Sequence, residues 1–558
     1  MGEKGNPMTE LEDEATPPTR REWLGLAALS TALGMIVLDG TIVGVALPTI
    51  IRDLDLDLTD AQWVNSIYAV VLAALLLSSG RLSDRLGRRR MLLVGLVLFM
   101  VGSILAALSD AASPLIWARV VQALGAALIM PATLSTVNAT FRGRYRAAAF
   151  GVWGAVISGA AAVGPLAGGA LTQYASWEWI FIVNIPLGLI VMVATVMWVR
   201  ETRGGDNRPG VDVDGALLSG IGFGALVFAI IEGPNLGWWK PTTDFTVFGL
   251  TWPATAPISI VPILLLVGIA ALVLFVLWER HRARNGRSAI LDLTLFSLPT
   301  FAWGNVTAAM VAVGEFAIIF VLPLYLMNVL GLDVMISGLI LAAMAVGAFV
   351  SGASARHLAA RFGAPGVVLL GLFLEVAGVL VLALFISSTS SGWLIAAVLA
   401  VYGLGLGLAS AQLTSTVLRD VPPKQSGQGS ATQSTVRQVG SALGTAFSGA
   451  ALSVALAITL PNALARGGIT GDAATQVADE TRQSAGTTIE ILRQRGTSSP
   501  FGADTDAVVQ ALADGFSDGT RAAMLVAVIF LALGVLGAVR VWVVARRSVG
   551  AEEPSGAR

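Results

Sequence analysis

Long apolar stretches alternate with short polar segments along almost the whole chain. Each stretch is near 20 residues long, the length with which an α-helix crosses the hydrocarbon core of a bilayer. The pattern predicts fourteen spans, near residues 23–47, 61–80, 91–109, 114–137, 147–171, 179–199, 213–232, 257–278, 300–327, 335–355, 366–386, 392–417, 430–458 and 521–545. The predicted fold class is therefore an all-α polytopic membrane protein with 14 transmembrane helices.

Composition agrees with a chain that lies mostly in lipid. The 558 residues are 55% hydrophobic and only 13% charged, with a mean hydropathy of +0.76. A soluble chain carries about 25% charged residues. The net charge of −1 gives no reason to expect a nucleic-acid partner. Because there are no cysteines and only two histidines, we expect no metal site and no cofactor.

The loop charges predict which side of the membrane the termini occupy. If both termini are inside, the inside segments hold 25 Lys and Arg residues and the outside segments hold 6. Positive loop residues accumulate on the cytoplasmic side. The sequence therefore predicts a multi-pass protein of the cell membrane, inner or cytoplasmic, with both termini cytoplasmic and with the bilayer as a partner.

Six ionisable residues interrupt the apolar runs: Asp39, Arg119, Glu232, Glu315, Glu375 and Arg437. A charge at the bilayer centre costs about 3 kcal/mol on insertion scales, so such residues usually face a bundle interior or a water-filled path. This favours a transporter. A membrane enzyme or receptor without flux is the contrasting class, but the sequence has no nucleophile, metal or phosphate-binding motif to support an enzyme.

Two groups of these residues are candidates for proton or cation coupling. Asp39 and Arg119 lie about 12 Å and 8 Å below the outer ends of their spans, counted at 1.5 Å per residue, so they can interact. Glu315 and Glu375 lie near the middle of their spans. Burial disfavours the charged form of a carboxyl, which lets it exchange a proton near neutral pH. A structural Asp39–Arg119 tether, and a neutral packed Glu375, are the alternatives.

The chain contains an internal repeat. The segment Gly80–Arg90 after the second span is echoed by 352–363 after the tenth, and the glycine-rich fourth span is echoed by Gly403, Gly405 and Gly407 in the twelfth. Corresponding positions lie about 270–285 residues apart. The simplest layout is two six-helix pseudo-repeats plus two extra central helices, with halves related by an axis along the membrane normal.

The layout divides the chain into five parts. They are a cytoplasmic N-terminal tail at 1–22, an N-terminal six-helix bundle at 23–199, a linker with two extra transmembrane helices at 200–299, a C-terminal six-helix bundle at 300–545 and a cytoplasmic tail at 546–558. The C-terminal bundle includes an extracytoplasmic loop at 460–520. Pro461 marks the expected helix exit, and 472–493 and 504–516 have helix-compatible patterns. A solvated cap is one interpretation of this loop, and a gating or partner-binding role is the other.

The segment after the second span resembles a signature of the major facilitator superfamily. Gly80 and Gly87 permit a tight turn, and Asp84 can pair with neighbouring arginines, here Arg85 and Arg88. The resemblance implies a conformational latch in which Asp84 also meets a helix N-terminus of the opposite half, the start of span thirteen. A positively charged retention loop is the simpler interpretation.

Two further segments resemble signatures of the same superfamily. Arg119, Gln122 and Gly125 in span four resemble the motif whose arginine is implicated in proton coupling. Span five resembles the antiporter motif, and its small residues also allow close helix packing while a proline bends the helix. The antiporter-helix residues are Gly159, Gly164, Pro165, Gly168 and Gly169.

Residues 38–48 and 177–186 are similar to segments of the fourteen-span drug:proton antiporter group, except that Gly44 stands where asparagine is common. Membership implies a proton-coupled multidrug efflux antiporter that works by alternating access. It would export lipophilic or cationic small molecules and contribute to antibiotic resistance, with protons as the coupling ion. We expect a monomer and no enzymatic activity.

Aromatic and polar side chains of the central spans are candidates for a substrate pocket, because aromatic rings bind cations through their faces. They are Tyr68, Gln122, Trp153, Trp303, Phe316 and Tyr325. Helix packing explains each aromatic residue equally well on its own. The alternative function is export of one endogenous metabolite, lipid or siderophore. Proton-coupled import of peptides or sugars is a further alternative. Fourteen-span peptide importers carry a Glu-x-x-Glu-Arg signature in span one, and the lack of resemblance here, where span one offers only Asp39, argues against import.

Overall fold

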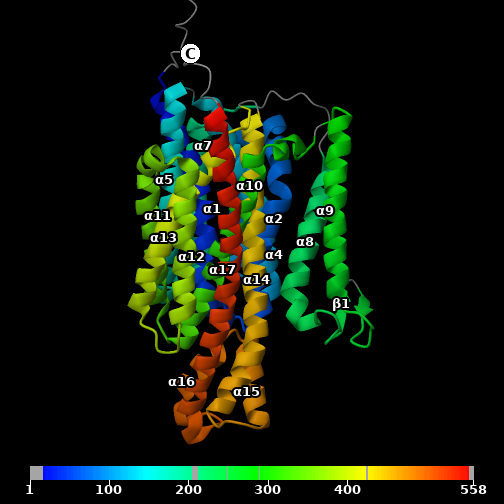
Figure 1. Ribbon diagram of the computed structural model, residues 1–558, viewed down its shortest axis with the longest axis vertical. Helices are drawn as coiled ribbons and strands as arrows, with labels where there is room; N and C mark the ends of the chain where they lie inside the picture. Colours follow the sequence, from blue (N-terminus) through cyan, green and yellow to red (C-terminus); the bar gives the residue numbers. More distant parts are fainter. Residues whose placement is uncertain are drawn as a thin grey trace, which may run out of the picture.

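The computed structural model describes residues 17–141, 143–203, 212–247, 249–287, 289–422 and 425–551. Most of the predicted N-terminal tail at 1–22 and the end of the predicted C-terminal tail at 546–558 lie outside these residues. The described part is almost entirely a bundle of long helices that run roughly along one axis (Figure 1).

The N-terminal half consists of helices up to residue 198. They are α1 (Arg20–Asp53), α2 (Leu58–Leu86), α3 (Arg88–Ala107), α4 (Ala112–Thr140), α5 (Gly143–Tyr174), α6 (Trp179–Ile182) and α7 (Asn184–Trp198).

Two extra helices and a small hairpin follow, and the C-terminal half completes the chain. The connecting elements are α8 (Val213–Leu236), strands β1 (Phe245–Val247) and β2 (Leu250–Trp252), α9 (Ile260–Arg284) and a 3₁₀ turn η1 (Leu293–Ser297). The C-terminal half holds α10 (Pro299–Leu324), a π-helical turn η2 (Tyr325–Val329), α11 (Val334–Phe362), α12 (Ala364–Phe385), α13 (Gly392–Val417), α14 (Ser426–Arg466), α15 (Asp472–Gln483), α16 (Thr487–Arg495), the short turns η4 (Gly496–Ser498) and η5 (Gly502–Asp504), and α17 (Thr505–Ala551).

The chain is a mostly helical polytopic membrane protein, as predicted. Among the described residues, 13 helical segments are long and apolar enough to cross a membrane. The predicted span at 147–171 is not among these 13, but it lies inside α5, a helix of 32 residues. The predicted sixth span is covered by α6 and α7 together. The count of fourteen therefore stays a prediction.

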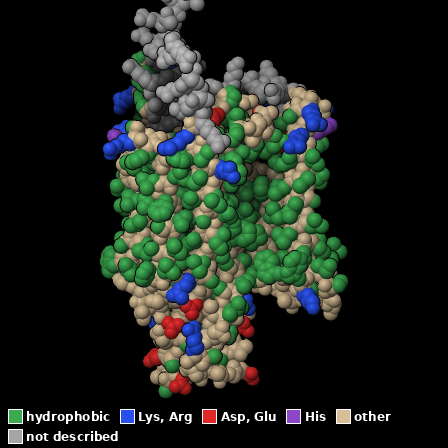
Figure 2. Space-filling model, in the orientation of Figure 1, with side chains coloured by type: hydrophobic (Ala, Val, Ile, Leu, Met, Phe, Trp, Pro, Cys, Tyr) green, Lys and Arg blue, Asp and Glu red, His purple; other side chains and the backbone are tan. Residues whose placement is uncertain are grey.

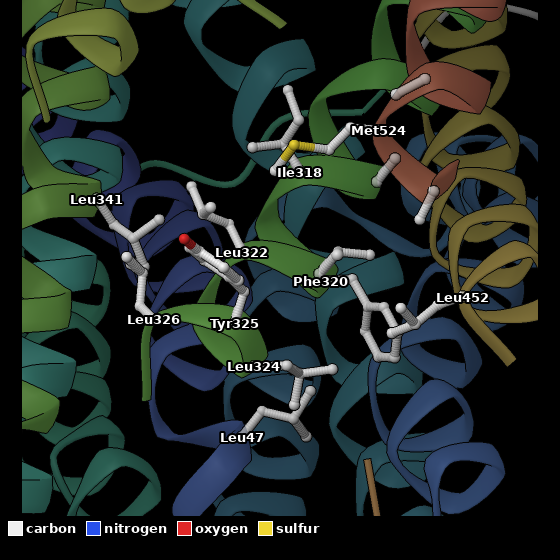
Figure 3. Close-up of a cluster of buried hydrophobic side chains, with 14 of the residues drawn as sticks. Leu47, Ile318, Phe320, Leu322, Leu324, Tyr325, Leu326, Leu341, Leu452 and Met524 are labelled. Carbon is white, nitrogen blue, oxygen red and sulfur yellow. The ribbon is translucent and has the colours of Figure 1, made fainter. Parts of the chain in front are cut away.

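The hydrophobic core is distributed unequally between the two ends of the bundle. One continuous core joins the second half of α1 to the C-terminal half and to the segment around α15 and α16. A separate core fills the first half of α1 with α3, α4 and α7. The close-up in Figure 3 shows the shared core, where Leu47 of α1 lies near Leu324 and Tyr325. The two halves are therefore packed together at the end that carries α15 and α16.

Close backbone contacts between the halves occur at this same end. A Cβ at Gly338 of α11 would lie 2.6 Å from the Pro165 carbonyl oxygen of α5. A Cβ at Gly44 of α1 would lie 2.9 Å from Cγ2 of Ile319 on α10, so an asparagine at position 44 would not fit without a shift. Glycine permits this approach because it has no side chain. We infer that the structure represents a state closed at the end of α15 and α16.

The predicted helix exit at Pro461 is wrong. Helix α14 continues through Pro461 to Arg466, and α17 begins at Thr505, so both helices project beyond the bundle (Figure 1). The extension persists because Leu460 is fully buried and packs against Gly515 of α17, which outweighs the backbone hydrogen bond that proline removes. We call the projection 459–520 the cap. The two helix-compatible patterns predicted within it form α15, α16 and the start of α17.

The cap is attached to the C-terminal half by polar contacts at η2. Arg493 donates to the Val329 carbonyl at 2.9 Å, and Asn328 donates to the Ala485 carbonyl at 2.9 Å. The first bond satisfies a backbone oxygen of the π-helical turn η2, and the second satisfies a backbone oxygen between α15 and α16 in the cap. The cap is thus a folded element with buried side chains of its own, such as Ile489.

The extra helices α8 and α9 pack as a pair beside α2 and α14 (Figure 1). Their ends opposite the cap are held by Asp212, which accepts hydrogen bonds from Gly215 N at 2.9 Å and Trp278 Nε1 at 2.9 Å and pairs with Arg282 at 3.1 Å. An apolar cavity of about 190 Å³ lies between this pair and the bundle. Figure 2 shows the surface hollowed between the pair and the bundle.

The outer surface separates by side-chain type. Figure 2 shows a broad hydrophobic band along the bundle, Lys and Arg at the rim opposite the cap, and both acidic and basic side chains on the cap. This agrees with a cytoplasmic face opposite the cap, although the side on which the termini lie stays a prediction. The hairpin β1–β2, which the hydrophobic pattern did not predict, lies between the outer ends of α8 and α9.

Candidate functional site

Asp39 lies in the middle of α1 and is fully buried. Its Oδ2 accepts from Arg119 Nη1 at 2.5 Å, and its Oδ1 accepts from Gln122 Nε2 at 3.1 Å and from Asn184 Nδ2 at 2.8 Å. A carboxylate in this setting is stable only because each of its oxygens is satisfied by a donor and a positive charge lies beside it. The predicted pairing of Asp39 with Arg119 is therefore present in the structure.

Arg119 of α4 is held on several sides. Besides Asp39, it donates to Gln122 Oε1 at 2.9 Å and weakly to the Val64 carbonyl of α2 at 3.4 Å. The face of the Tyr68 ring lies 4.4 Å from the guanidinium carbon, which adds a cation–π contact. The exposed fraction of the Arg119 side chain is 2%. The guanidinium therefore links α1, α2 and α4 at one point inside the N-terminal half.

Two members of this network were not singled out by the sequence. Ser103 of α3 accepts from Gln122 Nε2 at 2.8 Å and from Asn184 Nδ2 at 3.3 Å, and both Ser103 and Asn184 are fully buried. Asn184 begins α7, within the segment that resembled the antiporter group. A lone asparagine between apolar residues was the available signal. Ser103 offered none, because serines are common in membrane helices.

We call these six residues the N-half polar site: Asp39, Tyr68, Ser103, Arg119, Gln122 and Asn184. Tyr68 and Gln122, which were predicted as substrate-pocket residues, belong to this site, and their role in a pocket stays a prediction. Since α1, α2, α3, α4 and α7 each contribute at least one of these residues, the site joins five helices of the N-terminal half.

A second set of charged residues lies in the C-terminal half. Arg437 of α14 pairs with Glu315 of α10 at 3.4 Å, and their exposed side-chain fractions are 39% and 17%. In contrast to Asp39, this pair is accessible from outside the packed core. Arg437, one of the six ionisable residues within the apolar runs, is thus joined to the predicted coupling residue Glu315.

Glu375 lies in the middle of α12 and is fully buried. Neither of its carboxyl oxygens has a hydrogen-bond partner among the described residues. The hydroxyl of Tyr402 on α13, also fully buried, has no partner in that part of the chain either. Glu375 therefore lies outside the N-half polar site. Asp39 accepts hydrogen bonds from three side chains, whereas Glu375 accepts none from the described residues.

The remaining predicted pocket residues do not gather around one point. Tyr325 is buried near the outer end of the C-terminal half and donates to the Ser387 carbonyl at 2.5 Å, whereas Trp303 near the other end of α10 is 43% exposed. Phe316 follows Glu315, and Trp153 lies on α5; both are half-buried. Their joint role as a pocket stays a prediction.

Glycines of α5 allow close contact with both halves. A Cβ at Gly168 would lie 2.8 Å from the Ile42 carbonyl oxygen of α1, and one at Gly169 would lie 3.1 Å from the Met335 Cα of α11. Gly164 similarly faces Thr41, and the Pro165 carbonyl faces Gly338. Gly159 has open space around it. Four of the five predicted antiporter-helix residues thus form contacts where α5 lies between α1 and α11.

The segment Gly80–Arg90 forms the turn between α2 and α3. Asp84 accepts from Arg88 Nε at 2.7 Å, and Arg88 Nη1 donates to the Ser135 carbonyl of α4 at 3.0 Å. Gly87 adopts φ +112°, which favours glycine. Arg85 also has an interaction partner. The predicted contact of Asp84 with the start of span thirteen stays a prediction, because 423–424 lie outside the described residues.

Glu201 is a partner of this turn that the sequence did not suggest. Its Oε1 accepts from Arg89 N at 3.0 Å and its Oε2 from Arg90 N at 3.3 Å. The carboxylate therefore caps the N-terminus of α3, where it also favours the positive end of the helix dipole. Glu232, one of the six ionisable residues within the apolar runs, accepts from Trp63 Nε1 at 2.9 Å and joins α8 to α2.

The comparisons with known proteins agree with this architecture. Residues 29–445 match the model of the Major Facilitator Superfamily. The chain is 33% identical over 448 residues to multidrug resistance protein Stp of Mycobacterium tuberculosis, covering 80% of this chain and 79% of that protein. It is 30% identical to the tetracenomycin C resistance and export protein of Streptomyces glaucescens, covering 79% and 78%. It is also 29% identical to riboflavin transporter RibZ of Clostridioides difficile, covering 77% and 88%.

The fold agrees with a solved transporter. A bacterial homologue of the human lysosomal transporter Spinster superposes with a TM-score of 0.60 at 18% identity, covering 94% of this chain and 98% of that chain. The family match spans most of the chain and ends within α14, before the cap. The chain belongs to the major facilitator superfamily, among multidrug resistance and efflux transporters.

Proposed function

We propose that this protein is a proton-coupled antiporter that exports lipophilic, often cationic, compounds by alternating access. The observation that carries the proposal is the buried Asp39–Arg119 pair, whose charges are joined at 2.5 Å inside the N-terminal half. A buried ion pair is costly to dehydrate and costly to break, so it is rarely kept for stability alone. A proton that binds Asp39 removes the partner charge of Arg119.

The position of Asp39 supports a link between that proton and the outer contacts of the halves. Gly44, which faces Ile319 of the opposite half, lies five residues after Asp39 on the same helix. Ile42, which lies between them, contacts Gly168 of the antiporter helix. A rearrangement of the N-half polar site therefore moves the part of α1 that closes against α5 and α10.

The cargo meets a different charged group. Asp39 is fully buried, while Glu315 is partly exposed and pairs only at 3.4 Å with Arg437, which is itself more exposed. A lipophilic cation can therefore approach Glu315 without first opening the N-half polar site. In this division of roles, Asp39 carries the proton and Glu315 attracts the cargo.

Export as the direction of transport is supported by the antiporter-like glycines of α5 and by the relatives. The relatives include a multidrug resistance protein and a resistance and export protein. The polar networks of the two halves are separate, which agrees with two lobes that tilt relative to each other. We expect the protein to act in the cell membrane with protons as the coupling ion and without a cofactor.

The test uses purified protein in sealed liposomes and ethidium as a fluorescent lipophilic cation. An acidic lumen should drive ethidium into liposomes that carry the wild-type protein, and Asp39→Asn should abolish the ΔpH-driven part. Asp110→Asn is the matched control, because Asp110 is exposed between α3 and α4. Accumulation that ignores an imposed ΔpH and voltage in the wild type would overturn proton coupling, and intact exchange in Asp39→Asn would remove Asp39 from it.

Export of a single endogenous metabolite is the second candidate, favoured by the similarity to riboflavin transporter RibZ. A resistance panel with a knockout and an overexpressing strain discriminates the two. Altered sensitivity to several unrelated lipophilic compounds supports multidrug export. Unchanged sensitivity, together with accumulation of one cellular metabolite in the knockout, supports the narrower function.

A further inference from the structure

The crossing of α12 and α13 in the C-terminal half is built like the crossing of α3 and α4 in the N-terminal half. A Cβ at Gly125 would lie 2.6 Å from the Gly95 carbonyl oxygen, and one at Gly371 would lie 2.6 Å from the Gly405 carbonyl oxygen. The two glycine pairs therefore mark equivalent points, and residues at equal spacing from them occupy equivalent places.

The same correspondence holds one to two turns further along. Gly102 lies seven residues after Gly95 and faces Gln122, while Gly378 lies seven residues after Gly371 and faces Tyr402. Gln122 and Tyr402 each stand three residues before the glycine of their own helix. Tyr402 thus occupies the place in the C-terminal half that Gln122, a partner of Asp39, occupies in the N-terminal half.

Glu375 stands at the position that corresponds to Phe99. Each lies four residues after the first glycine of its crossing, and each backbone nitrogen is approached by the second glycine. Both side chains are fully buried. Because a phenylalanine fills this position in one half as part of the apolar core, packing at the crossing does not require a carboxyl. The glutamate in the other half needs a different explanation.

The absence of hydrogen-bond partners for Glu375 among the described residues supplies that explanation. Asp39 has a guanidinium and two amide donors, whereas neither oxygen of Glu375 has a partner in the described part of the chain, and the nearby Tyr402 hydroxyl also lacks one there. A buried carboxylate without a counter-charge is far less stable than the neutral acid. We propose that Glu375, with Tyr402, forms a second proton-binding site, so that one transport cycle moves two protons, on Asp39 and Glu375.

Tyr402 of α13 crosses α12 within one turn of Glu375, since a Cβ at Gly378 would lie 2.9 Å from the Tyr402 Cβ. In the proposed cycle a proton from water binds the Glu375 carboxylate, which becomes a neutral acid. It returns to water when the helix crossing is next exposed, and no other bond is made or broken.

Other charged groups are arranged around the ends of the helices that pack on α12. Arg437 of α14 acts on Glu375 together with Glu315, while Arg521 of α17 donates to the Ala383 and Ile386 carbonyls at the outer end of α12. The other charged or histidine residues of α11 and α17 lie toward the helix ends: Arg356, His357 and Arg361 on α11, and Asp506, Asp514, Asp518, Arg540, Arg546 and Arg547 on α17.

This inference rests on the proposed proton-coupled export, and the test counts protons. Ethidium is equilibrated across sealed liposomes at zero voltage, set by potassium and valinomycin, over a range of imposed ΔpH. The slope of the logarithm of the equilibrium ethidium ratio against ΔpH gives the number of coupled protons. Two protons give about a hundred-fold change in the equilibrium ethidium ratio per pH unit, and one gives about tenfold. We expect the higher slope in the wild type and the lower slope in Glu375→Gln.

Matched variants separate this role from a structural one. Glu232→Gln neutralises another membrane glutamate, one that already has Trp63 as a partner, and should keep the wild-type slope. Tyr402→Phe should keep the slope but slow the approach to equilibrium, and Glu375→Asp should restore the slope of the wild type. If Glu375 had only a structural role, Glu375→Gln would lower the transport rate without changing the slope of the ethidium ratio with ΔpH.

Each outcome decides the question. A wild-type slope of one proton, or a Glu375→Gln slope equal to that of the wild type, overturns the second site while proton-coupled export stands. A wild-type slope of zero overturns proton-coupled export itself. If Glu375→Gln does not transport, proton release on ethidium binding to the purified protein is counted with a pH dye. If Glu375→Gln releases one proton fewer per bound ethidium than the wild type, the second site is supported. If both proteins release the same number, the second site is overturned.

Discussion

Asn184 Nδ2 donates to Asp39 Oδ1 at 2.8 Å, although the two residues are 145 positions apart. Asn184 is the first residue of α7, and Asp39 lies in the middle of α1. Both side chains are fully buried. The last helix of the N-terminal half therefore holds the carboxyl that we expect to carry the proton, and it does so with a neutral donor that leaves the charge balance of Asp39 and Arg119 intact.

We predict that Asn184→Ala slows ΔpH-driven ethidium transport several-fold and lowers stability by about 1.5–3 kcal/mol, the range for a hydrogen bond to a charged group. Asp39 would lose one of its three donors while Arg119 remains in place. Transport rate and thermal unfolding of the purified protein measure the two effects. Asn462→Ala is the control, because Asn462 is exposed on the cap; an equal effect of both variants would contradict a special role for Asn184.

Arg119 and Asp39 should be strongly coupled in stability. Arg119→Gln leaves the Asp39 carboxyl buried without a counter-charge, which costs about 3–5 kcal/mol. The double variant Asp39→Asn with Arg119→Gln removes both charges, so its loss should be smaller than the sum of the single losses by about 0.5–3 kcal/mol. Thermal unfolding of the four proteins gives this coupling energy. Additive losses would show that the pair does not interact in solution.

Arginine at position 119 should not be replaceable by lysine. The guanidinium contacts Asp39, Gln122 and the Val64 carbonyl and lies on the face of Tyr68, a geometry that the single ammonium of lysine cannot reproduce. We expect Arg119→Lys to fold, since the charge is kept, but to transport ethidium at less than a tenth of the wild-type rate. A rate equal to that of the wild type would show that only the charge matters.

The sequence was informative about charges and less so about small polar groups. Asp39 and Arg119 are conspicuous because a charge in an apolar run is rare, and their depths in the two spans agree well enough to predict contact. Ser103 takes part through its position at the α3–α4 crossing, which the sequence of α3 alone does not reveal. Glu201 lies after the end of a span, where a carboxylate is ordinary, so its capping of α3 required the three-dimensional path of the chain.

The same contrast holds for the fold. Hydrophobic length was sufficient to predict the long helices, since a membrane span has a fixed minimum. At Pro461 the local rule for proline predicted an end, but burial of Leu460 against α17 carries the helix on to Arg466. The short hairpin β1–β2 has three residues in each strand, too few for a periodic pattern to be recognised.

The glycines of α5 should differ in their tolerance of a side chain. We predict that Gly168→Val abolishes transport and destabilises the protein, because the added Cβ would meet the Ile42 carbonyl oxygen at 2.8 Å, and backbone cannot move aside cheaply. Gly159→Val has the same helix-propensity cost but open space around the new side chain, so transport should stay within about twofold of wild type. Equal losses at both positions would mean that helix flexibility, and not contact with α1, explains the motif.

The turn between α2 and α3 allows a last comparison of two glycines. Gly87 has φ +112° and faces the Glu201 carboxyl, to which an added Cβ would come within 2.7 Å, whereas a Cβ at Gly80 would be 3.4 Å from Pro131, an ordinary contact. Gly87→Ala should therefore lower the free energy of unfolding by about 1–3 kcal/mol through backbone strain and displacement of the Glu201 carboxylate from the N-terminus of α3. Gly80→Ala should lower it by less than about 0.5 kcal/mol.

Glu201→Gln should lose part of the same stabilisation, about 0.3–1 kcal/mol, because the charge at the helix N-terminus is removed while the acceptor oxygen remains. Thermal unfolding of the three variants ranks these costs. If Gly80→Ala proved as harmful as Gly87→Ala, the positive φ and the Glu201 contact would not explain why the turn contains glycine at position 87.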